Sequence, residues 1–142
     1  MDQDLFSAVD RYLTNHLLPS DPLIDDTLKA NAEAGLPSID VSPTQGKLLH
    51  LLARMQGARR ILEVGTLGGY STIWLARALP PDGTLVTLEL NPKHAKVAAA
   101  NLQHAGLKHL VDMRVGPAID SLSQLHAEKA APFDLIFLDA DK

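Results

Sequence analysis

The sequence contains no cysteine, which excludes disulfide bonds, thiolate metal sites and cysteine nucleophiles. It also lacks a run of Lys and Arg, and 13 basic against 17 acidic residues give a formal net charge of −4. Since sequence-independent binding of nucleic acid rests on neutralising phosphates, we expect no nucleic-acid partner. No apolar run approaches the ~20 residues of a membrane-spanning helix, and the acidic start at Met1–Asp4 is unlike a signal peptide. We therefore expect a soluble, cytoplasmic protein without a membrane partner.

Hydrophobic residues make up 46% of the chain, which is enough for a folded core. The length fits a single domain over residues 1–142. Apolar residues at helical spacing predict a helical segment over 1–57, with one helix at 23–33. Ser42 and Pro43 are a typical N-cap and first-turn pair for a further helix.

The remaining residues, 58–142, alternate between short apolar runs and helical stretches. Each run is suited to a strand buried on both faces, so the alternation predicts an α/β fold with a parallel sheet. Ligands of such sheets bind at the carboxyl ends of the strands. The expected strands are 61–64, 85–88, 110–115 and 133–138, and the expected helices are 70–79, 92–105 and 117–128.

A glycine-rich turn follows the first expected strand, in the segment Glu63-Val64-Gly65-Thr66-Leu67-Gly68-Gly69-Tyr70-Ser71. Its spacing matches neither the dinucleotide-binding motif nor a P-loop, so phosphate binding is poorly supported. An acid at position 63 repels a pyrophosphate and attracts an ammonium group. A ligand with an amine near Glu63, and a carboxylate near the free N–H groups of the turn or near Ser71, fits this pattern. The alternative is a turn that merely requires glycine.

Glu89 ends the second expected strand, where a carboxylate would accept both hydroxyl groups of a ribose. Alone, it is equally typical of an exposed acid at a loop. Together with Glu63 it indicates a nucleoside joined to an amino acid, of which S-adenosylmethionine is the obvious example. After the third strand, Gly116-Pro117-Ala118 either leaves room for an adenine ring or simply begins a helix.

The fourth expected strand is followed by Asp139-Ala140-Asp141-Lys142. Here Asp139 is suited to a divalent cation, and Lys142 to taking a proton from a substrate hydroxyl group. The alternative is a solvated transition from strand to loop. The six histidines form no zinc signature, and we expect His94 and His104 to be solvated on the exposed side of a helix.

These segments, together with Ile39-Asp40-Val41-Ser42-Pro43, resemble the cation-dependent O-methyltransferases, a family that includes the caffeoyl-CoA and catechol enzymes. The resemblance covers the whole chain. It implies a Rossmann-like S-adenosylmethionine methyltransferase sheet with strand order 3-2-1-4 in this part. The residues that it implies as contacts of S-adenosylmethionine are Val41, Glu63, Gly65, Thr66, Gly68, Ser71, Glu89, Ala118 and Asp141.

The resemblance also implies the reaction, which is in-line transfer of a methyl group to a phenolic or catechol oxygen of a small molecule. Asp139 would bind the divalent metal, usually Mg²⁺, and Lys142 would be the general base; together they would promote loss of a phenol proton whose pKa is near ~10. A homodimer is expected, because dimers are common in this family. Family members continue past this point with further strands and metal ligands, so we expect the core at 58–142 to be incomplete at its C-terminus.

Two alternatives remain at this stage. The first is a nicotinamide-dependent oxidoreductase on a similar sheet, which suits Glu89 but neither Glu63 nor the glycine spacing. The second is a non-catalytic cofactor-binding or assembly module whose sheet pairs with another chain.

Overall fold

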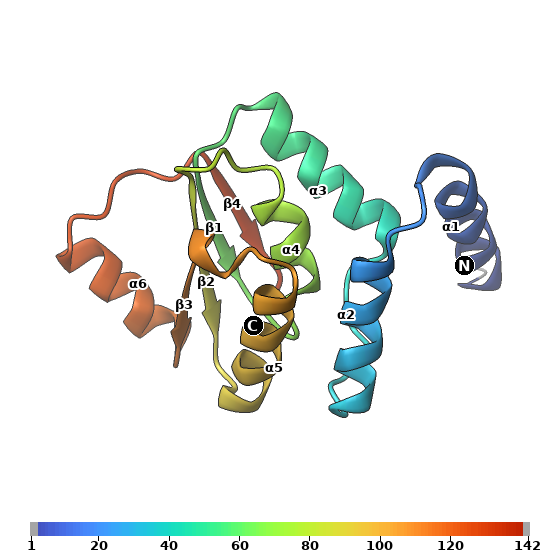
Figure 1. Ribbon diagram of the computed structural model, residues 1–142. Coiled ribbons are helices and arrows are strands. Elements are labelled where there is room, and N and C mark those ends of the chain that lie inside the picture. Colours follow the sequence, from blue (N-terminus) through green and yellow to red (C-terminus); the bar gives the residue numbers. More distant parts are fainter. Residues whose placement is uncertain (1–2, 141–142) are drawn as a thin grey trace.

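The computed structural model describes residues 3–140, which fold into helices around one four-stranded sheet (Figure 1). The predictions for Asp141 and Lys142 therefore lie outside the described residues. In chain order the elements are α1 (Gln3–Leu17), α2 (Pro22–Glu33), α3 (Pro43–Met55), β1 (Arg60–Val64), α4 (Tyr70–Ala76), β2 (Thr84–Glu89), α5 (Pro92–His104), the 3₁₀ helix η1 (Lys108–Leu110), β3 (Val111–Val115), α6 (Ala118–Ala127) and β4 (Leu135–Leu138).

All neighbouring strands pair in parallel, in the order β3-β2-β1-β4, which confirms the predicted sheet. Helices α4 and α5 lie on one side of the sheet with α2 and α3 beyond them, and α6 lies on the other side (Figure 1). Successive residues of a strand face opposite sides. In β1, Ile61 therefore packs in the core beside α4, whereas Leu62 packs in the core beside α6.

The element boundaries follow local hydrogen bonds. Ser42 caps α3 as expected, in a capping box with Gln45. The strand expected over 133–138 begins only at Leu135. Just before it, the Asp134 carboxylate accepts the N–H groups of Arg59 and Arg60, and the Asp134 N–H donates to the carbonyl of Arg60. These bonds fix where β4 joins the sheet.

Burial of the strands differs from the expectation at both edges of the sheet. β1 and β2 are buried, but exposed residues alternate along β4, where Ile136 is 58% and Leu138 73% exposed. The expectation that all four strands are buried on both faces is thus wrong for β3 and β4. The reason is coverage: α6 contributes Leu125 to the core over β1 and β2, and the described residues do not extend that cover over β4.

The N-terminal helices also present apolar residues to solvent. α1 packs beside α3 and buries none of its own residues. Among residues 3–140, no helix is both long and apolar enough to cross a membrane. The exposed apolar side chains of α1 and α3 are Leu5, Phe6, Val9, Tyr12, Leu13, Leu17, Leu48, Leu51, Leu52 and Met55.

The ends of β1 and β4 approach each other closely at Gly65. The backbone N–H of Asp139 donates to the carbonyl of Val64 at 2.9 Å. Gly65 has φ of +102°, and a Cβ atom at this position would lie 1.9 Å from the backbone oxygen of Asp139. The glycine is therefore required both by its backbone conformation and by the neighbouring strand.

We expect Gly65→Ala to lower the free energy of unfolding by about 3 kcal/mol, because it adds left-handed backbone strain to a steric overlap. Gly57→Ala is the matched control, since φ is +62° there and nothing lies within 4 Å of the added Cβ. It should cost about 1 kcal/mol. Urea denaturation of both variants measures the difference, and equal losses would contradict the close approach.

Candidate functional site

A cavity of about 770 Å³ lies at the carboxyl ends of the strands, a volume typical of small-molecule sites. None of the described residues that line it is Lys or Arg, whereas three carry carboxylates. Its walls are formed by Ile39, Asp40, Val41, Val64, Gly65, Thr66, Leu67, Ser71, Leu88, Glu89, Leu90, Asn91, His94, Gly116, Pro117, Ala118, Asp139 and Ala140.

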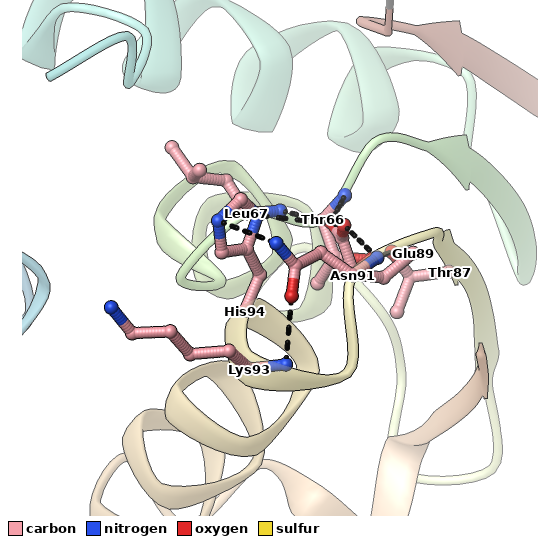
Figure 2. A network of polar contacts seen from close by, with 7 residues as sticks. All are labelled: Thr66, Leu67, Thr87, Glu89, Asn91, Lys93 and His94. Carbon is pink, nitrogen blue, oxygen red and sulfur yellow. Dashed lines mark hydrogen bonds and ion pairs between the residues drawn. The ribbon is translucent and has the colours of Figure 1, made fainter. Parts of the chain in front are cut away.

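The Glu89 carboxylate joins the glycine-rich turn to the end of β2 (Figure 2). Its Oε2 atom accepts the backbone N–H groups of Thr66 and Leu67, at 3.2 and 2.8 Å. Its Oε1 atom accepts the N–H of Asn91 at 2.8 Å. Bonds from backbone donors to an ionised acceptor are stronger than neutral ones, so Glu89 fixes the shape of this part of the cavity.

This arrangement corrects one expectation about the turn. The N–H groups of Thr66 and Leu67 are taken by Glu89, and those of Gly65 and Gly69 donate to carbonyl groups of Leu88 and Thr66. The sequence predicts N–H groups in the turn that are free for a ligand carboxylate. These four groups are not free, so the prediction is wrong for them. Two of the partners, Glu89 and Leu88, lie 22 or 23 residues further along the chain, so the local sequence does not reveal them.

Glu63 is completely buried beneath the cavity wall, on the α4 side of the sheet. Its carboxylate accepts hydrogen bonds from the hydroxyl groups of Ser71 and Thr72, both at 2.6 Å, and of Thr87 at 2.7 Å. The Thr87 hydroxyl donates to Glu63 and therefore accepts from Thr66 at 2.6 Å. Hydroxyl groups thus connect the buried carboxylate to the turn.

Burial raises the pKa of Glu63 to about 7 from an ordinary value of 4.5. The hydroxyl groups of Ser71, Thr72 and Thr87 oppose this rise, and the negative charge of Asp139 adds to it. Since Ser71 uses its proton to reach Glu63, its oxygen offers lone pairs to the cavity. The site therefore suits a positively charged donor next to Ser71.

The segment that includes Val41 is held over the cavity by Asn31. The Nδ2 group of Asn31 donates to Oδ1 of Asp40 at 3.0 Å, and its Oδ1 accepts from Asn101 at 3.0 Å. Asn101 also donates to the carbonyl of Gly68 at 2.8 Å. These side-chain bonds connect α2, α5 and the turn to the cover of the cavity.

The predicted site residues fall into three groups: those that line the cavity, those that do not line it, and those that lie outside the described residues. Those that line the cavity are Val41, Gly65, Thr66, Ser71, Glu89, Ala118 and Asp139. Glu63 and Gly68 do not line it: Glu63 lies behind Ser71, and a Cβ at Gly68 would meet the Asn31 side chain at 1.9 Å. Direct contact of these two residues with a ligand stays a prediction, as do the roles of Asp141 and Lys142.

Sequence reasoning missed His94, which we expected to be solvated. It lines the cavity, and its Nδ1 atom lies 3.5 Å from Oε1 of Glu89 (Figure 2). The available signal was its place in the first turn of a helix that starts three residues after Glu89, because side chains there face back toward the strand end. Asp40 and Asn91 were missed as well, and both were adjacent to residues that had been singled out.

The metal prediction rests on Asp139, which is one of the residues that line the cavity. Hard divalent cations need several oxygen ligands. Residues 3–140 contain no group of three or more His, Asp or Glu side chains that could hold a metal ion. Asp139 and the other described residues therefore do not complete a cation site by themselves.

Comparison with known proteins adds independent information. A family model described as O-methyltransferase matches residues 16–142. A catechol O-methyltransferase from Niastella koreensis is 54% identical over all of this chain and 64% of its own length. The crystal structure of an O-methyltransferase from Bacillus cereus in complex with SAH has a TM-score of 0.93 at 56% identity, over 95% of this chain and 61% of that one.

The O-methyltransferase TomG from Streptomyces achromogenes, solved in complex with SAM, gives a TM-score of 0.92 at 51% identity, over 100% of this chain and 64% of that one. The chain thus spans less than two thirds of the length of each of these proteins.

The raised pKa of Glu63 predicts how stability depends on pH. Between pH 4.5 and about 7 the folded state holds a proton that the unfolded state releases, so the free energy of unfolding falls as the pH rises through this window. For this group alone the fall amounts to about 3 kcal/mol. We expect Glu63→Gln to remove it, as measured by urea denaturation at pH 5 and pH 8. Glu33→Gln, which changes an exposed carboxylate, should retain the fall, and equal pH dependence in both variants would contradict the assignment.

Proposed function

The chain belongs to the O-methyltransferase family, and we propose that it forms the S-adenosylmethionine-binding part of an enzyme that methylates a phenolic or catechol-type hydroxyl group of a small molecule. The observation that carries the proposal is the charge of the cavity wall. The wall has carboxylates from Asp40, Glu89 and Asp139 and, among the described residues, no Lys or Arg. S-adenosylmethionine brings a sulfonium, an ammonium and two ribose hydroxyl groups, which such a wall stabilises.

The proposed ligand extends across the strand ends. The adenine ring lies at Gly116, which has no side chain, and at Ala118, which has a small one, and the ribose lies at Glu89. The amine donates to the Ser71 oxygen, with Glu63 behind that hydroxyl and Asp139 at the cavity. A bound ammonium favours the ionised form of Glu63, because opposite charges lower the pKa of a carboxyl group.

The proposed reaction is an in-line displacement. The acceptor hydroxyl loses its proton to Lys142, its oxygen forms a bond to the methyl carbon, and the carbon–sulfur bond breaks with its electron pair staying on sulfur. Holding oxygen, carbon and sulfur in line supplies much of the rate advantage. The divalent cation, usually Mg²⁺, stays a prediction with Asp139 as its one predicted ligand; such an ion would lower the pKa of the acceptor hydroxyl group.

The nicotinamide-dependent oxidoreductase loses its support. A pyrophosphate needs free backbone N–H groups or cations. The Thr66 and Leu67 groups are bound to Glu89 instead, and no described wall residue is Lys or Arg. A non-catalytic cofactor-binding module is the outcome if the cofactor binds without methyl transfer.

The homodimer and the cytoplasmic location are part of this proposal. The dimer is supported by the apolar side chains that α1 and α3 expose, such as Phe6 and Leu48. Exposed apolar patches of this kind commonly mark protein interfaces. Sedimentation of the purified protein as a monomer at micromolar concentration would contradict the dimer.

Calorimetric titration with S-adenosylhomocysteine tests the binding site. We expect the wild type to bind, Ser71→Ala to lose a hydrogen bond to the amine, and Glu89→Gln to lose a charged acceptor for the ribose. A hydrogen bond to a charged group contributes about 1.5–3 kcal/mol, so each variant should weaken binding about 10- to 100-fold. Ser123→Ala and Glu128→Gln, both on the exposed side of α6 and the loop after it, should bind like the wild type.

Absence of heat with the wild type would reject the proposed site. Methyl transfer is tested separately, by incubating the protein with S-adenosylmethionine and catechol and measuring the methylated catechol by chromatography. Binding without any product under these conditions would favour the non-catalytic alternative.

A further inference from the structure

His94 stands beside Glu89 on the cavity wall, in the first turn of α5 (Figure 2). Its side chain is 20% exposed, and its Nδ1 atom faces Oε1 of Glu89 at 3.5 Å. A group that reaches this oxygen from the cavity therefore also reaches the imidazole ring.

The hydrogen bonds of Asn91 assign the tautomer of this ring. Oδ1 of Asn91 caps α5 by accepting the N–H of Lys93 at 2.9 Å, so its Nδ2 group is the one next to His94 Nε2, at 3.3 Å. An amide nitrogen only donates, so Nε2 is the acceptor of this contact. Neutral His94 consequently carries its proton on Nδ1, the atom that faces Glu89.

Glu89 has one acceptor position left for a ligand. A carboxylate offers about four lone-pair positions, and the N–H groups of Thr66 and Leu67 take two on Oε2 while that of Asn91 takes one on Oε1. Nδ1 of His94 lies near the same Oε1 atom, but their distance of 3.5 Å is longer than the usual N–H···O distance of about 2.7–3.2 Å. The gap suits a group that donates to Oε1 and accepts from Nδ1–H, which a hydroxyl group does.

We propose that His94 is a specificity-determining residue that recognises one ribose hydroxyl group of the bound cofactor, donating from Nδ1 to the hydroxyl oxygen while Glu89 accepts the hydroxyl proton. The inference rests on the proposed function and deepens it, because it assigns ribose recognition to two side chains and not to Glu89 alone. A deoxy position offers neither a donor nor an acceptor to this pair.

Calorimetry with S-adenosylhomocysteine and its 2′-deoxy and 3′-deoxy analogues tests the proposal. The wild type should bind one of the two analogues at least 10-fold more weakly than S-adenosylhomocysteine. His94→Phe keeps a planar ring but removes the donor, so it should weaken binding of S-adenosylhomocysteine about 3- to 10-fold and leave binding of that analogue unchanged. His94→Asn retains a donor near the position of Nδ1 and should restore part of the discrimination.

His104→Phe is the matched control, because His104 lies on the same helix with its side chain 66% exposed. It should bind all three compounds like the wild type. If His94→Phe weakens all three equally, the ring acts only through the local structure and the proposal is wrong. If the wild type binds none of the three compounds, the proposed function is wrong, and so is this inference. The two failures are thus distinguishable.

A second measurement examines the ring without any cofactor. Nitrogen-15 NMR of the histidine side chains at pH 8, assigned by loss of the His94 signals in His94→Phe, should show the tautomer protonated at Nδ1. Asn91→Ala removes the donor to Nε2 and should shift the ring toward the more common Nε2-protonated tautomer. An Nε2-protonated ring in the wild type would overturn the assignment.

Discussion

The Glu89 carboxylate accepts backbone N–H groups from the turn after β1 and from the start of α5, and the shape of the cavity depends on these bonds. Without an acceptor there, the N–H groups of Thr66 and Leu67 would be partly buried and unpaired, which is costly. The same carboxylate faces the cavity, so the group that shapes the turn is also the group that a ribose would meet. Structure and proposed binding therefore depend on the same charge.

Glu63 extends this polar framework into the core. Burying a carboxylate is unfavourable, and the raised pKa expresses that cost even with three hydroxyl groups as partners. A nearby ammonium would compensate for it, because Glu63 reaches the cavity through Ser71. The framework is thus less stable at neutral pH without a cation than it would be with one. Strongly shifted pKa values of buried groups cluster at functional sites.

Much of the fold could be predicted from the sequence because its signals are local: the β/α alternation, the Ser42 cap and the helical spacing of apolar residues. The approximate position of the site followed from the topology of parallel sheets. What sequence reasoning missed depends on distant partners. His94 was assigned to solvent because helical periodicity alone does not show that the first turn of α5 faces a strand end. Likewise, the sequence does not show that the Asn31 side chain, which lies far away along the chain, packs against Gly68.

A crystal structure of the protein with S-adenosylhomocysteine tests the proposed binding mode most directly. We expect the ligand amine within hydrogen-bond distance of Ser71 Oγ, and a ribose hydroxyl between Oε1 of Glu89 and Nδ1 of His94. A ligand carboxylate at Ser71, or a ribose that contacts neither Glu89 nor His94, would contradict it.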